Sequence, residues 1–409
     1  MNSDRKHTKK QQYKNDIIKL LYLQKSQTNA NLVKETGLSL PTVTQLLNEL
    51  TEEHFIELLG SGNSSGGRKP NLIGLTDDAF YVVSVAIERY SAKIALINSK
   101  NNIVTGTKQI DLDIKDKNAT VDIISSELNS FKNQLDINRE RLIGVGISMP
   151  GLTNTDKGIN YNFLNFGKQS FVEILTERIG LPVYIINDAK SRALAELRFG
   201  KAKGTSNTLV IYIGWGLGTG LILDGKLYYG SMGFAGEFSH IPIIENGILC
   251  HCGKRGCLET VASGMALERL ALKGIANGEN TELTRLAGKS PKHIHYMTVV
   301  DSALKGDSFS IDILTEIGSE LGRGIAMLVQ ILNPELILFG GQMLKAGHFL
   351  TIPIEHSLNK YCLTDLRNTY KIGTSDMGEE ASLLGPVINV VEKYFSNPNN
   401  NFNKQKSSL

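Results

Sequence analysis

Hydrophobic positions near the start of the chain recur at helical spacing and are interrupted by two short polar breaks. The first predicted helix begins near Asn15. The second is predicted from about Asn29 to Glu35 and ends at Gly37, because glycine readily adopts the left-handed backbone of a helix C-terminus. Ser39 is expected to cap a third helix through "LPTVTQLLNELTEEHF". This spacing predicts a helix-turn-helix.

The third predicted helix has one apolar and one polar face. The apolar face carries Val43, Leu46, Leu47 and Leu50. The outward residues are Pro41, Thr42, Thr44, Gln45 and Asn48. A recognition helix presents short polar groups of this kind to base edges in the major groove, so these five are candidate DNA contacts.

Two further apolar stretches follow this helix and predict a wing. "IELLGSG" and "NLIGL" are expected to form two strands, joined by the tip "NSSGGRKP" with Arg68 and Lys69. Cationic side chains on such a tip suit the phosphate backbone or a narrow minor groove. Residues 1–76 are therefore interpreted as a winged helix-turn-helix DNA-binding domain, with a protein-docking module as the alternative.

From Phe80 onward the pattern changes to continuous apolar runs alternating with helical stretches. Runs such as "YVVSVAI", "LIGVGISMP" and "ELILFGG" are typical of buried strands, and the alternation predicts mostly parallel sheets covered by helices. We expect a two-lobed α/β body, with lobes at residues 77–189 and 190–378. The polar tail, residues 395–409, is predicted to be disordered.

Several of these strands end in small or polar residues, where ligands bind in such sheets. The segments concerned are Pro150 with Gly151, Asn187 with Asp188, Gly214 to Gly220, and Gly340 with Gly341. One glycine cluster alone reflects only a tight turn. Their recurrence after strands predicts a ligand cleft.

Composition narrows the class of protein. The chain has 409 residues, of which 41% are hydrophobic and 21% charged, as in soluble globular proteins with more than one domain. No apolar run reaches the roughly 18 residues of a membrane span, and no secretory signal follows the basic N-terminus, which indicates the cytoplasm. A net charge of +3 implies no polyanionic partner by itself, but five of the first 14 residues are Lys or Arg.

Two adjacent segments carry the most specific pattern in the sequence. "GFAGEFSHIPI" and "CHCGKRGCLE" resemble the GxxGExGH and CxCGxxGCxE motifs of the ROK family, and "GGRKP" resembles the wing of its repressor branch. The resemblance extends from about Asn15 to Glu392. It implies an actin-like, sugar-kinase-type fold for the body, in which a C-terminal helix at residues 379–394 returns to the first lobe.

Three of the four cysteines lie in one stretch of eight residues. Cys250, Cys252 and Cys257 are candidate thiolate ligands of a structural zinc ion, and His240 is the expected fourth ligand. His251 is nearer in sequence, but the middle position of a Cys-x-Cys pair is expected to point away from the metal. A reduced, metal-free cluster or a redox site is the alternative.

The resemblance also assigns residues to a sugar. They are Asn162, Asn187, Asp188, Glu237, His240 and Glu259. Carboxylates and carboxamides form hydrogen bonds with neighbouring hydroxyl groups, and a site of this kind rejects analogues that leave its groups unpaired.

The phosphate-binding motifs of the family's kinases are altered. "ERYSAK", from Glu88 to Lys93, replaces a glycine-containing DxGGTxK motif, and Trp215 replaces a threonine in the second phosphate loop. Lys190 also stands where an asparagine is common. A kinase needs backbone amides close to the phosphates, so no enzyme activity is expected and Asp188 is a vestigial base position.

These features together predict a sugar-responsive transcriptional regulator, most simply a repressor of carbohydrate uptake or catabolism genes. Its expected partners are an inverted-repeat operator, a sugar or sugar-phosphate effector and further copies of itself in a dimer or tetramer. The effector would act by favouring one arrangement of the two lobes. Two alternatives remain: an ATP-dependent sugar kinase with a DNA-binding head, and a regulator controlled by a protein docking on the zinc lobe.

Overall fold

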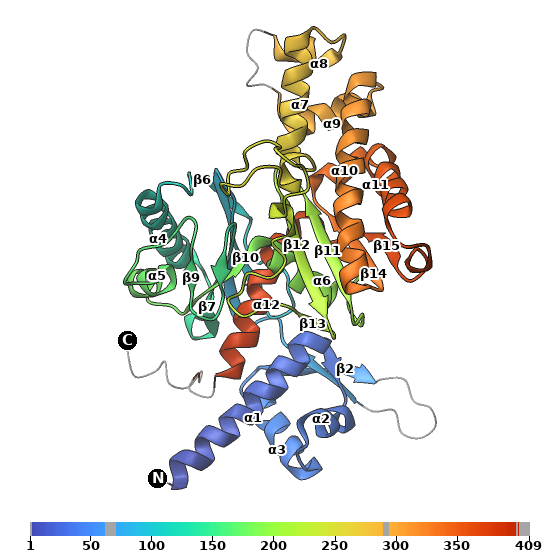
Figure 1. Ribbon diagram of the computed structural model, residues 1–409. Coiled ribbons are helices and arrows are strands. Elements are labelled where there is room, and N and C mark those ends of the chain that lie inside the picture. The colour runs from blue at the N-terminus through green and yellow to red at the C-terminus, as the bar shows by residue number, and fades with distance from the viewer. Residues whose placement is uncertain (1, 62–70, 289–293, 398–399, 401–409) are drawn as a thin grey trace. The chain divides into compact units, whose positions relative to one another are not determined.

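The computed structural model describes residues 2–61, 71–288, 294–397 and 400 of the chain (Figure 1). The chain divides into two compact units, Met1–Ser191 with Ser382–Leu409, and Arg192–Ala381. The first unit includes the predicted DNA-binding head and receives the C-terminal helix.

The head contains three helices, α1 (Asn2–Gln24), α2 (Asn29–Thr36) and α3 (Leu40–Glu52). Gly37 ends α2 with a φ of 67°, and the Ser39 side chain caps α3 by accepting a hydrogen bond from Thr42 N, as predicted. Helix α1 starts well before Asn15, where its start was expected. Lys, Arg and Gln residues propagate a helix even without an apolar stripe, which explains the extension.

A small antiparallel sheet completes the winged helix-turn-helix. Its order is β1-β3-β2, and its strands are β1 (Ser26–Gln27), β2 (Ile56–Ser61) and β3 (Asn71–Leu75). The two wing strands match the prediction, whereas the sequence pattern did not indicate the short β1. Arg68 and Lys69 lie outside the described residues.

The first lobe is built on a five-stranded sheet of order β10-β7-β4-β5-β6. Its strands are β4 (Tyr81–Ile87), β5 (Ser91–Asn98), β6 (Lys108–Asp111), β7 (Leu142–Met149) and β10 (Val183–Asn187). The β10-β7 and β7-β4 pairings are parallel, whereas the β4-β5 and β5-β6 pairings are antiparallel, so the expectation of a mostly parallel sheet is wrong. A short turn joins β4 to β5 and residues 99–107 join β5 to β6, and both connections are shorter than a parallel crossover requires. The small strands β8 (Thr153–Asn154) and β9 (Ile159–Asn160) pair beside the sheet.

Alternating residues on β4 face two different helical layers. Val83, Val85 and Ile87 belong to the core with α4 (Lys117–Gln134) and α5 (Phe171–Ile179). Ser84 points to the other side, where its hydroxyl donates to Leu383 O of α12 (Ala381–Ser396). Figure 1 shows α12 on the opposite face of the sheet from α4 and α5.

The approach of α12 to this sheet is very close. A Cβ atom on Gly146 of β7 would lie 2.5 Å from Pro386 O, so only glycine fits there. Helix α12 continues to Ser396 and includes the fully buried Phe395, two residues into the tail predicted to be disordered. The polar, low-complexity composition of the tail gave no indication that its first two residues belong to a packed helix.

The second unit contains the sheet β13-β12-β11-β14-β15. Its strands are β11 (Thr208–Ile213), β12 (Leu217–Leu223), β13 (Lys226–Leu227), β14 (Leu336–Gly340) and β15 (Lys371–Thr374). Strands β11, β14 and β15 are parallel, and the hairpin strands β12 and β13 are antiparallel. This sheet is also mixed, because short turns join β11 to β12 and β12 to β13.

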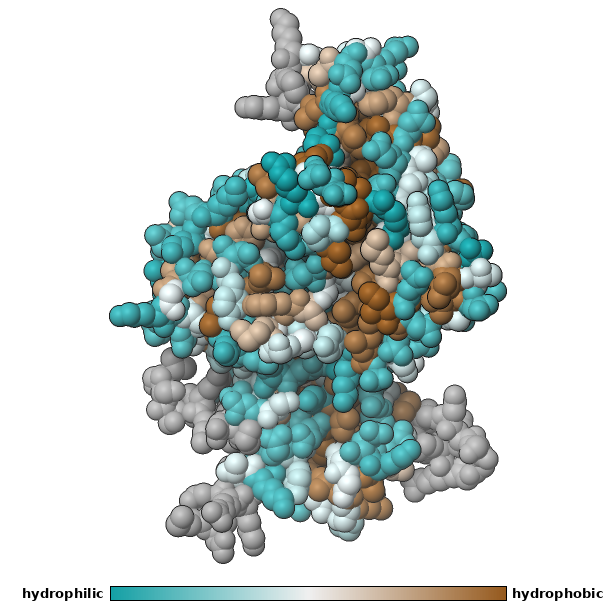
Figure 2. Space-filling model, viewed as in Figure 1, coloured by the Kyte–Doolittle hydropathy of each residue, from teal (hydrophilic) through white to brown (hydrophobic). Residues whose placement is uncertain are grey.

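Helices cover the second sheet and form its core. They are α7 (Gly264–Asn277), α8 (Glu282–Ala287), α9 (Tyr296–Leu304), α10 (Ser308–Leu332) and α11 (His348–Tyr361), while α6 (Asp188–Phe199) begins in the first unit and continues into the second. Helices α10 and α11 pack closely because Gly318 and Gly322 face backbone carbonyls of α11. None of the described helices is long and apolar enough to cross a membrane, and hydrophilic residues are spread widely over the face shown in Figure 2.

Candidate functional sites

The outer face of α3 is the candidate DNA-reading surface. Pro41, Thr44, Gln45 and Asn48 are exposed, and Thr42 is half-buried with its hydroxyl 2.8 Å from Ser39 Oγ. The inward residues Val43, Leu46, Leu47 and Leu50 are buried. The structure therefore keeps the predicted division between an apolar face and a polar one.

The carboxyl ends of β7 and β10 bring two predicted segments together in the first unit. These parallel strands pair with Met149 opposite Asn187. The Asn187 carboxamide donates hydrogen bonds to Gly151 O at 3.2 Å and to Asp188 Oδ1 at 3.1 Å. Gly151 and the Asn187–Asp188 pair thus lie at one edge of the sheet, as expected for neighbouring parallel strands.

Asp188 occupies the first position of helix α6 and is half-buried. Its Oδ1 accepts a hydrogen bond from Ala189 N at 2.9 Å in addition to the one from Asn187. The positive end of the helix dipole favours a carboxylate here. Asp188 can therefore act as a charged acceptor for a ligand hydroxyl.

Asn162 lies in the loop that follows β9 and is exposed. Its Oδ1 accepts a hydrogen bond from Leu152 N at 2.5 Å, so part of its polar capacity is used within the loop. The fully buried Asn160, which the sequence did not single out, holds the same loop. It donates to Pro150 O at 2.9 Å and accepts from Phe163 N at 2.9 Å. Asparagine at a turn is the signal that would have indicated this role.

In the second unit, the glycine segments after β11 and β14 also meet. A Cβ atom on Gly341 would lie 2.2 Å from Ile213 O. Trp215 occupies the turn between β11 and β12, and its carbonyl accepts a hydrogen bond from Met265 N at 2.8 Å, at the start of α7. A large side chain therefore stands in the loop between these two strands.

The segment from Glu88 to Ser91 forms a tight turn between β4 and β5. Glu88 N donates to Ser91 O at 2.8 Å. Arg89 Nε donates to Tyr90 Oη at 2.9 Å, and the Tyr90 side chain is 59% exposed. Two large side chains thus occupy the tip of this turn.

The second-unit residues assigned to a sugar lie around two short 3₁₀ helices. The first is η2 (Phe238–His240), which half-buried Glu237 precedes, and the second is η3 (Leu258–Thr260), which contains Glu259. Glu259 is buried and its Oε1 accepts a hydrogen bond from Leu217 N at 3.3 Å. Its Oε2 lies 3.8 Å from His240 Nδ1.

The three cysteines and His240 converge in space. Their ligand atoms all lie within 4.8 Å of one another. Cys250 Sγ is 3.6 Å from His240 Nδ1, and Cys252 Sγ is 3.6 Å from Cys257 Sγ. Two atoms each about 2.3 Å from a tetrahedral zinc ion would be about 3.8 Å apart, so these separations fit a zinc shell.

The protonation of this cluster also suits a cation. Burial raises the pKa of the Cys250 thiol to about 12, so thiolates crowded here need a compensating positive charge. Burial, together with the nearby charges of His251 and Lys254, lowers the pKa of His240 to about 4, which keeps the imidazole neutral as a metal ligand must be.

His251 does not point away from the cluster, contrary to the sequence expectation. Its Nδ1 lies 3.3 Å from Glu259 Oε2 and 3.9 Å from Cys250 Sγ. The short turn through Gly253 and the isolated bridge between Leu249 and Arg255 fold the loop back on itself, which brings this ring to the glutamate. His240 remains the histidine that lies within reach of all three cysteines.

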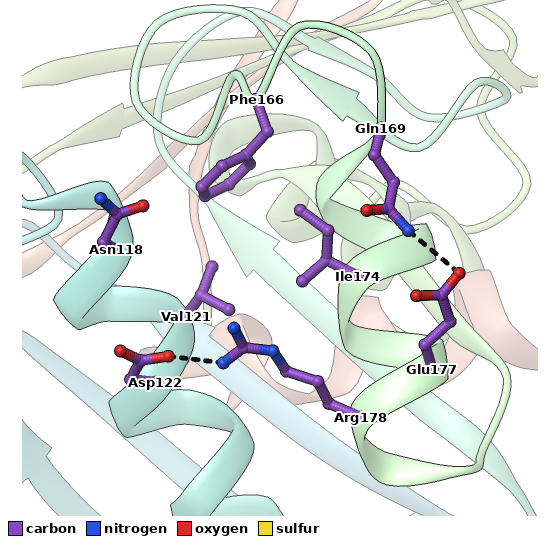
Figure 3. Close-up of a pocket in the computed structure, with 8 residues that line it drawn as sticks. All are labelled: Asn118, Val121, Asp122, Phe166, Gln169, Ile174, Glu177 and Arg178. Atoms are coloured by element: carbon purple, nitrogen blue, oxygen red, sulfur yellow. Dashed lines mark hydrogen bonds and ion pairs between the residues drawn. The ribbon is translucent and has the colours of Figure 1, made fainter.

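A pocket of about 450 Å³ lies between α4 and α5 (Figure 3). Figure 3 shows Arg178 pointing to Asp122 and Gln169 pointing to Glu177, and these pairs are 2.5 and 3.0 Å apart. None of the residues assigned to a sugar lines this pocket. The pocket therefore does not coincide with the predicted site.

Comparison with known proteins covers both parts of the chain. Residues 82–393 match the ROK family, and residues 11–57 match a winged helix-turn-helix DNA-binding family. The first match extends over residues of both compact units, and the second covers the three helices of the head from residue 11 onward.

Three relatives illustrate the similarity. The chain is 29% identical over 371 residues to a xylose repressor of Bacillus spizizenii, which covers 90% of this chain and 91% of the repressor. It is 36% identical over 249 residues to a glucokinase of Halalkalibacterium halodurans, which covers 60% of this chain and 74% of the kinase. A crystal structure of a ROK family transcriptional regulator, a homolog of the Escherichia coli MLC protein, superposes with a TM-score of 0.78 at 28% identity, over 95% of this chain and 97% of that one.

Proposed function

The chain belongs to the ROK family, and we propose that it is a sugar-responsive transcriptional repressor that controls carbohydrate uptake or catabolism genes. One observation carries the proposal. A winged helix-turn-helix, with a capped α3 whose polar face is exposed, precedes the ROK body in the same chain. The xylose repressor aligns over this head as well as the body.

DNA binding is assigned to α3 and the wing. Pro41, Thr42, Thr44, Gln45 and Asn48 would face base edges, and the cationic Arg68 and Lys69 would contact the phosphate backbone. We propose a homodimer or tetramer on an inverted repeat, because two symmetry-related heads read two half-sites. The assignment of DNA contacts to α3 is supported by the exposure of Pro41, Thr44, Gln45 and Asn48.

Sugar binding is assigned to six residues by the resemblance to the ROK family. The proposed contacts are Asn162, Asn187, Asp188, Glu237, His240 and Glu259. The hydrogen bond of Asn187 to Asp188 and the contact of Glu259 with the His240 region support two preorganised groups of acceptors. A sugar or sugar phosphate that favours one state of the protein would change DNA affinity by linkage.

We propose that His240, Cys250, Cys252 and Cys257 hold a structural zinc ion. A bound zinc would cross-link the loop before η3 to η2 and supply no open coordination position. This link would hold the proposed sugar contacts His240 and Glu259 in fixed positions, because His240 lies in η2 and Glu259 lies in η3. The ligand separations, the raised pKa of the Cys250 thiol and the lowered pKa of His240 support the proposal.

Kinase activity is the second candidate function, and the 36% identity to a glucokinase favours testing it. We propose that the protein lacks this activity. Arg89 and Tyr90 fill the tip of the first loop, and Trp215 occupies the second, so backbone amides have less access to phosphates.

The proposed function is tested with the full-length protein. Its operator is selected from a randomised duplex library, and the dissociation constant is then measured with pentoses, hexoses and their phosphates. We expect selective binding that one sugar changes at least tenfold, and no ATP turnover with any sugar in a coupled assay. Absence of sequence-selective DNA binding would refute the repressor assignment, and turnover would establish the kinase alternative.

A further inference from the structure

An acidic side chain on the recognition helix contacts one of the proposed base-reading residues. Glu49 Oε1 accepts a hydrogen bond from Gln45 Nε2 at 3.1 Å, one helical turn earlier on α3. Two lysines of α1 hold the same carboxylate. Lys10 Nζ lies 2.6 Å from Oε1 and Lys14 Nζ lies 3.0 Å from Oε2.

This carboxylate is firmly fixed and charged. Burial alone would raise the pKa of Glu49, but the hydrogen bonds from Lys10, Lys14 and Gln45 outweigh it and lower the pKa to about 2. Lys14 is only 8% exposed and also pairs with Glu53 at 2.7 Å. Glu49 is therefore an anion at neutral pH, held between two helices of the head.

A fixed anion determines which way the Gln45 carboxamide points. One N–H of Gln45 is directed to Glu49, and a rotated amide would instead place its oxygen against the carboxylate, which is repulsive. The second N–H and Oε1 remain for another partner. In the major groove, adenine presents an acceptor at N7 and a donor at N6, which match that pair.

We propose that Glu49 is a positioning residue for sequence recognition: it orients the Gln45 carboxamide so that Gln45 reads an adenine in the operator. This inference rests on the proposed DNA-binding function. It assigns a role to a residue that cannot attract DNA by itself, since a carboxylate repels phosphates.

The charges around Glu49 give the proposal a distinctive signature. Lys10 and Lys14 are balanced by Glu49 and Glu53, so this cluster contributes no net charge toward the DNA phosphates. Removal of Glu49 leaves one extra positive charge. It should therefore strengthen binding to non-specific DNA while it weakens discrimination between bases.

The test uses the full-length protein and the operator selected from a randomised library. Gln45→Ala first identifies the adenine at which base preference is lost. Wild type, Glu49→Ala, Glu49→Gln and the control Glu52→Ala are then compared on operators carrying each base there. Glu52 is exposed on the same helix, so its removal changes the charge equally.

We expect Glu49→Ala to lower discrimination at that base about fivefold to tenfold, within the range of one bidentate contact. Glu49→Gln keeps an oxygen that accepts from Gln45, so it should retain most of the discrimination. Glu52→Ala should retain all of it. If Glu49→Ala does not fold, Glu49→Met keeps the side-chain length without the acceptor and takes its place.

Three outcomes overturn the inference. Discrimination unchanged in Glu49→Ala, an equal loss in Glu49→Gln and Glu49→Ala, or a Gln45 position that prefers no adenine would each exclude the positioning role. These results leave the repressor assignment intact, because wild type still binds its operator selectively. Wild-type protein that selects no DNA sequence would instead refute the proposed function itself.

Discussion

The ring of Phe80, at the start of the first lobe, packs against the ring of Phe395 near the end of the chain, with centroids 5.5 Å apart. The ring of Phe80 also packs against the ring of Tyr22 of α1, with centroids 5.6 Å apart. Gln12 of α1 donates a hydrogen bond to Phe395 O at 3.4 Å. The C-terminal helix therefore joins the sheet of the first lobe to the first helix of the head.

Phe395→Ala should destabilise the first unit by about 3–5 kcal/mol, because the side chain is fully buried and its removal leaves a cavity. Denaturant unfolding followed by circular dichroism measures the change. Tyr361→Ala is the matched control, since Tyr361 is 44% exposed in the second unit and its loss should cost less than about 0.5 kcal/mol. A loss below about 1 kcal/mol for Phe395→Ala would contradict the packing role of the C-terminal helix.

Cys257→Ser should abolish zinc binding and weaken the response to sugar at the same time. The cluster then offers three ligands, too few for a closed structural site. Zinc per chain is measured by mass spectrometry of the metal, and the sugar response by DNA binding. Cys362→Ser is the control, because Cys362 is buried elsewhere with its thiol 3.9 Å from Ala326 O. Sugar response retained without zinc would show that the metal cluster and the sugar site are independent.

Asp188→Asn should raise the dissociation constant of the effector sugar about tenfold or more, because a charged acceptor strengthens each hydrogen bond from a hydroxyl. Calorimetry with the sugar that changes DNA affinity measures this. Asp122→Asn is the comparison, since Asp122 lines the separate pocket of Figure 3 and pairs with Arg178. An effect of Asp122→Asn larger than that of Asp188→Asn would move the sugar site to that pocket.

Glu49 should make the head sensitive to acid. Its folded-state pKa, about 2, lies below the ordinary value of 4.5, so its stabilising contribution is complete above about pH 4.5 and is lost as the pH falls toward 2. At pH 7 we expect the free energy of unfolding of wild type to exceed that of Glu49→Gln by about 1 kcal/mol. The difference is small because water screens the charge of a carboxylate near the surface. Urea unfolding between pH 7 and pH 3 measures the difference, which should shrink as the pH falls. A difference independent of pH would contradict the ion pairs with Lys10 and Lys14.

Local sequence determined much of the secondary structure. Gly37 and Ser39 mark the end of α2 and the start of α3, because a left-handed C-cap and a side-chain N-cap depend on one residue and its immediate neighbours. The apolar runs identified β4, β7 and β14, and the motif around His240 and the cysteines identified the cluster that the structure brings together.

Tertiary structure alone decided the relationships between distant segments. The pairing of Glu49 with Lys10 and Lys14 and the packing of Phe395 against Phe80 join residues whose own neighbours in sequence give no sign of the partner. Local propensities act within a few residues, whereas these contacts exist only once the helices and sheets have packed.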